Sequence, residues 1–164
     1  MAIFELFSGR HEEARRRLQR ALEINPNLAM AQGYLGVKNA FAGDFDAAVQ
    51  HVDEAIRLSP RDPLLIIFPL AKGWAALNAE RYDEAVEYAT HAAEADPEFP
   101  DIHAVLASAN GHLGRAGPAC AALEQLLHRM PGLTASDPRL DRPFARADDR
   151  KRFLEGLRKA GMPA

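Results

Sequence analysis

The stretch QGYLGVKNAFAGDFDAAVQHVDEAIRLSP, residues 32–60, decides the fold of this chain. It contains two runs with apolar residues at helical spacing, which meet at Gly43 and Asp44, and it ends at Pro60. Glycine adopts the positive φ that ends a helix, and an acidic residue stabilises the N-terminus of the next helix. Proline stops the second helix because it has no amide hydrogen to donate. The stretch therefore predicts two antiparallel helices joined by a tight turn.

The same pattern recurs along the chain. Four prolines are separated by 34, 37 and 34 residues: Pro26, Pro60, Pro97 and Pro131. An alanine precedes each proline by twelve residues: Ala14, Ala48, Ala85 and Ala119. Five residues before this alanine, three of the units have a glycine: Gly9, Gly43 and Gly114. The remaining unit has Glu80 at this position. This shared register predicts four helical hairpins that stack side by side.

These positions resemble the tetratricopeptide repeat family, and residues 32–60 are the best match, with Leu35, Gly36, Ala48 and Pro60 in place. The resemblance implies an all-α solenoid with repeats at about 1–26, 27–60, 61–98 and 99–133. The first repeat is truncated, because its leading helix begins only at Met1. The third carries extra residues near its start and Pro69 within its first helix, so a late start or a kink is expected there.

The repeat pattern ends after Pro131, and we call residues 134–164 the closing segment. Its first part reads as a loop, and a last helix is expected from about Asp148 to Ala160, with Gly161 as its stop. One face of this helix is apolar, carrying Phe153, Leu154 and Leu157. A solenoid has to cover the open side of its last hairpin, so this amphipathic helix is expected to be a cap.

The run from Arg142 to Pro163 carries a second resemblance. With Phe144, Arg152, Phe153 and the following Leu154-Glu155-Gly156-Leu157, it is similar to the C-terminal end of bacterial proteins whose repeats follow an adenylate or guanylate cyclase domain or a winged-helix regulator domain. This resemblance implies a regulatory or protein-binding tail. The repeats and the cap use nearly every residue, so the cyclase domain itself has no room here.

Composition and motifs narrow the function further. The chain has 164 residues, of which 48% are hydrophobic and 26% charged, which suits a folded domain. Its formal net charge of −3 gives no general attraction to nucleic acid, and no apolar run reaches the length of a membrane span. A single cysteine, Cys120, and the lack of a leader pattern favour the cytoplasm. No phosphate-binding loop, zinc motif or catalytic constellation is found, so neither an enzyme nor a cofactor is expected.

In the family that the chain resembles, the first helix of each hairpin lines a concave groove, and the register implies which residues face it. The candidate partner-binding residues are Met30, Val37, Phe41, Ile67, Leu70, Trp74, Leu77, Asn78, Asp101, Ser108 and His112. Gripping a chaperone tail needs Lys, Asn and Arg at set groove positions, but the residues there are Gly33, Val37, Ala71, Asp101 and Val105, so this use is not expected. An apolar groove suits the nonpolar face of a helix or an extended apolar peptide, with Trp74 as an anchor. Alternatively, the chain's N-terminal segment, a second subunit or the final helix covers it.

Three functional hypotheses remain open at the level of the sequence. The first is a non-catalytic protein-interaction module that binds a helix or an apolar peptide in its groove. The second is a regulatory C-terminal piece of a nucleotide cyclase or a transcriptional regulator. The third is a scaffold that self-associates, for example as a homodimer, through the apolar residues of the truncated repeat: Ile3, Phe4, Leu6 and Phe7.

Charge is unevenly distributed, although its sum is small. Residues 42–101 carry 13 acids and 4 bases, a net charge of −9, whereas residues 139–164 carry 4 acids and 8 bases, a net charge of +4. These two parts of the chain are expected to attract each other or a partner.

Overall fold

The computed structural model describes residues 10–60 and 67–164. Within these ranges the chain forms eight α-helices and one short 3-10 helix, and no strand. The elements are α2 (His11–Ile24), α3 (Ala29–Ala42), α4 (Phe45–Leu58), α5 (Ile67–Asn78), α6 (Tyr82–Ala95), α7 (Pro100–His112), α8 (Ala116–Arg129), η2 (Pro138–Leu140) and α9 (Ala147–Lys159). The predicted all-α class is confirmed.

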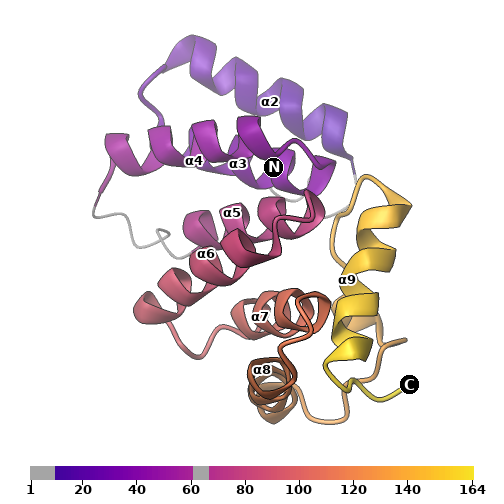
Figure 1. The fold of residues 1–164 in the computed structure, drawn as a ribbon. Helices are drawn as coiled ribbons and strands as arrows, with labels where there is room; N and C mark the ends of the chain where they lie inside the picture. The colour runs from indigo at the N-terminus through magenta and orange to yellow at the C-terminus, as the bar shows by residue number, and fades with distance from the viewer. Residues whose placement is uncertain (1–9, 61–66) are drawn as a thin grey trace.

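The helices are arranged as consecutive hairpins (Figure 1). Helix α3 pairs with α4, α5 with α6, and α7 with α8, and each hairpin packs against the next through contacts between α3 and α5, α4 and α5, and α6 and α7. Helix α2 packs against α3. This is the stacked helical-hairpin solenoid that the four prolines predict, while the repeat boundaries within it stay a prediction.

The turns between paired helices share one backbone conformation. Gly43 and Gly114 have φ values of 78° and 68°, as expected for residues that end a helix. Glu80 occupies the equivalent place in the third hairpin and has a φ of 61°. A side chain in this left-handed region costs about 1–2 kcal/mol, so Glu80 holds a conformation that glycine adopts more easily.

Small residues occupy the inner positions at which the described helices approach one another. The four alanines at the inner position are almost completely buried: Ala14, Ala48, Ala85 and Ala119. One turn further on, the same face buries Leu18, Val52, Ala89 and Leu123. Because these positions have little volume, helix backbones approach closely and the larger side chains fill the spaces between hairpins.

The first helix of the third hairpin differs from its neighbours. The described part of α5 begins at Ile67, so Pro69 lies in its first turn. The amide groups of a first turn have no acceptor within the helix, so a proline is tolerated there. Lys72, at a position where leucine is usual, forms an ion pair with Asp53. Its ammonium nitrogen also lies 5.4 Å from the centre of the Tyr88 ring. A charged residue is accommodated here because its stem is covered and its end is paired.

The final helix lies one residue earlier than expected at both ends, and Gly161 follows it with a φ of 101°. Its apolar face is buried as predicted, at Phe153, Leu154 and Leu157. The self-association residues Ile3, Phe4, Leu6 and Phe7 lie outside the described residues. Among the helices of the described ranges, none has the length and apolar character to cross a membrane.

Candidate functional site

The closing segment lies against α3, α5 and α7, the helices expected to line the concave groove, and we keep the word groove for the face of these helices that it contacts. Helix α9 packs against α7 and also reaches α5, so it lies along one side of the solenoid (Figure 1). The loop before α9 continues to α3, where the amide nitrogen of Ala145 donates a hydrogen bond of 2.8 Å to the carbonyl oxygen of Phe41. One segment of the chain therefore contacts the first helix of three successive hairpins.

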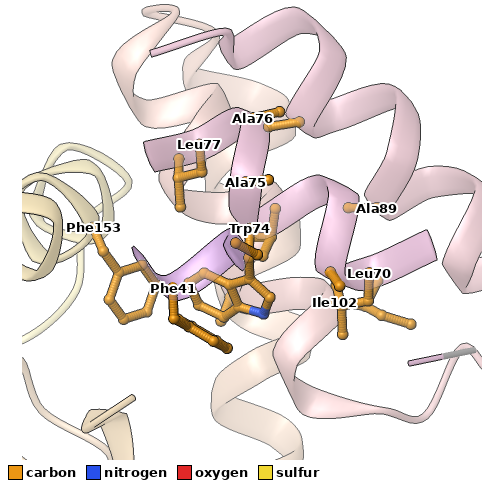
Figure 2. Close-up of a cluster of buried hydrophobic side chains, with 14 of the residues drawn as sticks. Phe41, Leu70, Trp74, Ala75, Ala76, Leu77, Ala89, Ile102 and Phe153 are labelled. Atoms are coloured by element: carbon orange, nitrogen blue, oxygen red, sulfur yellow. The ribbon is translucent and has the colours of Figure 1, made fainter. Parts of the chain in front are cut away.

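An aromatic cluster stands at the centre of this contact. Figure 2 shows Trp74 of α5 grouped with Phe41 of α3 and Phe153 of α9. The ring centre of Trp74 lies 5.5 Å from that of Phe41 and 5.0 Å from that of Phe153. Phe144 adds edge-to-face contacts, with its ring centre 5.9 Å from Trp74 and 5.5 Å from Phe41. Such pairs contribute about 0.5–1.5 kcal/mol each beyond the area that they bury.

Helices α7 and α9 meet through their backbones. The hydroxyl of Ser108 donates to the carbonyl oxygen of Phe153 at 2.9 Å, and Nε2 of His112 donates to the carbonyl oxygen of Arg152 at 2.8 Å. Gly111 and Gly156 make this approach possible. A Cβ atom built on Gly111 would lie 2.2 Å from the carbonyl oxygen of Gly156, which no real side chain tolerates.

Two ion pairs attach the closing segment to the solenoid. Arg142 forms a two-pronged pair with Asp101, in which Nε and Oδ2 are 3.1 Å apart. Arg152 donates to Glu80 at 2.9 Å and to the carbonyl oxygen of Asn78 at 3.2 Å. These contacts join the acidic part of the chain to its basic end, so the attraction expected from the charge distribution is realised within the chain.

A buried carboxylate organises the arginines at the start of α9. Asp149 is 1% exposed and accepts hydrogen bonds from Arg146 at 2.7 Å and from Arg152 at 2.8 Å. Burial acts to lower the pKa of Arg152, but the hydrogen bond to Asp149 and the charge of Glu80 outweigh it and raise that pKa. Arg152 therefore stays charged while it is partly buried.

The structure brings most of the predicted groove residues together, beneath the closing segment. Six of them contact it directly: Phe41, Trp74, Asn78, Asp101, Ser108 and His112. Three more are buried, Val37, Leu70 and Leu77, and Ile67 is partly buried. Met30 is exposed, at 43%. Among the described residues, the final helix, one of the covers that the sequence left open, lies over Trp74 together with the loop before it. Trp74 is 3% exposed, so the groove is filled rather than open, and partner binding by these residues stays a prediction.

Several residues that hold the closing segment were missed by the sequence analysis as site residues: Glu80, Phe144, Arg146, Asp149 and Gly156. Two features of the sequence point to these residues. Four of them lie in residues 142–163, the run that resembles the C-terminal end of cyclase and regulator proteins. In addition, the opposite net charges of residues 42–101 and 139–164 indicate a contact between these two parts. What the sequence lacked was the path of the loop before α9.

The polar groups near the groove are engaged in structural contacts. The hydroxyl of Ser108 is fully buried and bonded to Phe153, so it is not placed as a nucleophile. The rings of Tyr82 and His112 stack with centres 4.5 Å apart, beside a hollow of 410 Å³. Burial, followed by the charge of Glu80, raises the pKa of Tyr82. Across the described ranges, no three His, Cys, Asp or Glu side chains gather as a metal site.

The sequence matches the family model of the tetratricopeptide repeat over residues 3–63 and 70–137, which is more than half of the chain. The chain belongs to the tetratricopeptide repeat family. Members of this family stack their repeats into extended surfaces that bind other proteins. A search among curated proteins returns no match for this tetratricopeptide repeat chain.

Solved structures of MamA have the same fold. A crystal structure of MamA gives a TM-score of 0.66 at 17% identity, over 98% of this tetratricopeptide repeat chain and 92% of that chain. The MamA RS-1 ArsTM double mutant gives 0.66 at 22% identity, over 97% and 88%. MamA of MSR-1 gives 0.63 at 21% identity, over 97% and 90%. At these identities the similarity shows the fold alone.

Proposed function

We propose that this chain is a non-catalytic protein-interaction module whose concave groove binds the apolar face of an amphipathic helix. The observation that carries the proposal is the segment already in the groove, in which Phe153 of α9 and Phe144 of the loop before it lie against Trp74. An apolar groove that accepts aromatic anchors from a helix is a recurring mode of peptide recognition. The closing segment is thus the groove's resident ligand.

A partner helix engages the groove by taking the place of the closing segment. Because the segment is part of the same chain, it competes at an effective concentration on the order of millimolar. A partner at cellular concentration therefore needs tighter contacts, or a change that weakens the segment. Arg142 and Phe144 are the contacts to weaken, since they lie before α9 and join it to Asp101 and to the aromatic cluster.

The test measures binding of a fluorescently labelled peptide of residues 139–164 to the full chain by polarisation. We expect a chain with Arg142→Ala and Phe144→Ala to bind the peptide at least tenfold more tightly than the unaltered chain does. The control carries Lys151→Ala and Arg158→Ala, two exposed positions on the same segment, and binds like the unaltered chain. Binding that is undetectable in every chain would contradict the proposal. Circular dichroism establishes that the variants fold.

The resemblance of residues 142–163 to cyclase and regulator tails supports a second candidate, a regulatory tail. The residues that carry it make the groove contacts described above, among them Arg142, Phe144, Arg152 and Phe153. A tail whose groove opens and closes is suited to regulation. The test adds the chain to a cyclase catalytic domain encoded upstream in the same genome region and measures the formation of cyclic nucleotide. This candidate is wrong if no such domain is encoded there, or if the chain leaves the rate of formation unchanged.

Self-association through Ile3, Phe4, Leu6 and Phe7 is a third candidate, because these four side chains are apolar. Light scattering on the full chain and on a chain lacking residues 1–7 tests it. A larger mass for the full chain alone is expected, and two monomers would refute it.

A further inference from the structure

The crossing of α7 and α9 is too close for any side chain at its centre. A Cβ atom built on Gly156 would lie 2.3 Å from the hydroxyl oxygen of Ser108 and 2.4 Å from the carbonyl oxygen of the same residue. The hydroxyl belongs to a side chain that can rotate, but the carbonyl belongs to the backbone of α7. A residue larger than glycine at this point would have to move one helix away from the other.

The short distance between α7 and α9 allows side chains of α7 to hydrogen-bond to the backbone of α9. Ser108 and His112 stand one turn apart on the same face of α7, and both donate to backbone carbonyl oxygens of α9. Donors on short side chains reach a helix backbone only when the two helices are nearly in contact. The groove therefore recognises the backbone of its occupant, and the glycine is the condition for that recognition.

Charge sets a second requirement for the occupant. Asp101 and Glu80 receive arginines that are ten residues apart in the closing segment, Arg142 and Arg152. Residues 42–101, which include both carboxylates, have a net charge of −9. Asp101 and Glu80 therefore attract an occupant that carries arginines at these two places and repel an acidic one.

From these contacts we infer that the groove selects basic amphipathic helices that carry glycine at the crossing point, with a phenylalanine three residues before it and a leucine directly after it. The resident example is Arg152-Phe153-Leu154-Glu155-Gly156-Leu157. This inference rests on the proposed function, because it describes which partners the groove accepts once the closing segment has left it.

The test compares two altered peptides of residues 139–164 on the full chain that carries Arg142→Ala and Phe144→Ala. One peptide carries Gly156→Ala and the other carries Glu155→Ala at the adjacent, exposed position. Alanine favours helix formation over glycine, so helix propensity alone predicts tighter binding of the Gly156→Ala peptide. The close crossing of α7 and α9 predicts weaker binding of this peptide instead, because its added methyl group would clash with Ser108. We expect the Gly156→Ala peptide to bind at least tenfold more weakly than the unaltered peptide, and the Glu155→Ala peptide to bind within threefold of it.

Equal or tighter binding of the Gly156→Ala peptide would overturn the inference and leave the proposed function standing. Failure of the unaltered peptide to bind would overturn both. If the double variant does not fold, a chain with a protease site inserted at the exposed Gly132 is cut after folding. The same peptides are then compared for their ability to displace the cut segment, with the emission of Trp74, the single tryptophan of the chain, as the readout.

Discussion

At the scale of single residues, the contact between α7 and α9 depends on a side chain that is absent. Gly111→Ala places a methyl group against the carbonyl oxygen of Gly156, and we expect it to lower the free energy of unfolding by about 1–3 kcal/mol, the usual cost of overpacking. Gly117→Ala is the matched control, because a Cβ atom there meets nothing within 4 Å. Urea denaturation measures both, and an equal effect of the two substitutions would contradict the close approach.

Glu80 is a residue in which two requirements conflict. Its φ of 61° suits glycine, yet its carboxylate holds Arg152 of the closing segment. Unfavourable backbone conformations persist where the surrounding structure or a function requires the side chain. The third repeat, whose sequence has glutamate where the other three have glycine, is therefore the one whose turn contacts the closing segment through this side chain.

At the scale of elements, the attachment of α9 depends on its first turn. Asp149 lies there, where a carboxylate suits the helix dipole, and it also bonds two arginines while buried. We expect Asp149→Asn to lower the free energy of unfolding by about 1.5–3 kcal/mol, the usual value of hydrogen bonds to charged groups. Asp148→Asn changes the same turn at an exposed position and should cost less than about 1 kcal/mol. Thermal or urea denaturation checks both, and a comparable loss in the two variants would show that the network around Asp149 adds nothing.

At the scale of the whole molecule, the free energy of unfolding is expected to depend on pH through two partly buried histidines, His11 of α2 and His51 of α4. Burial, together with the charge of Lys38, lowers the pKa of His11 below 6.5. Burial is also the main cause of the lowered pKa of His51, whose Nδ1 lies 2.7 Å from Oε1 of Gln32. Between the folded and unfolded pKa values, the unfolded chain binds more protons, so stability falls as pH decreases.

We therefore expect the free energy of unfolding to be nearly constant above about pH 7 and to decrease as the pH is lowered through 6.5 and below. The chain with His11→Gln and His51→Gln should show a flatter profile than the unaltered chain. His91→Gln removes an exposed histidine and serves as the control. Urea titrations at pH 7.5 and 5.5 provide the measurement, and parallel profiles for all three chains would refute this origin of the pH dependence.

Local sequence determined the hairpins, their stacking and the amphipathic last helix. Each of these depends on neighbours in the chain: a glycine that ends a helix, alanines twelve residues before a proline, or apolar residues at helical spacing on α9. The register, together with the resemblance to the family, also predicted that residues such as Trp74 and Ser108 face the groove, and both contact the closing segment. Such features follow from short-range stereochemistry and from periodicity, both of which are visible in a linear sequence.

Only the tertiary structure decided what lies in the groove. Phe144 meets Phe41 and Trp74, and Arg142 meets Asp101, across separations of 41 residues or more. The path of a loop is not periodic, and several covers would bury the same apolar surface. The closing segment fills the groove because its glycine, aromatic rings and arginines fit that surface together, which is a property of three-dimensional complementarity that no local pattern encodes.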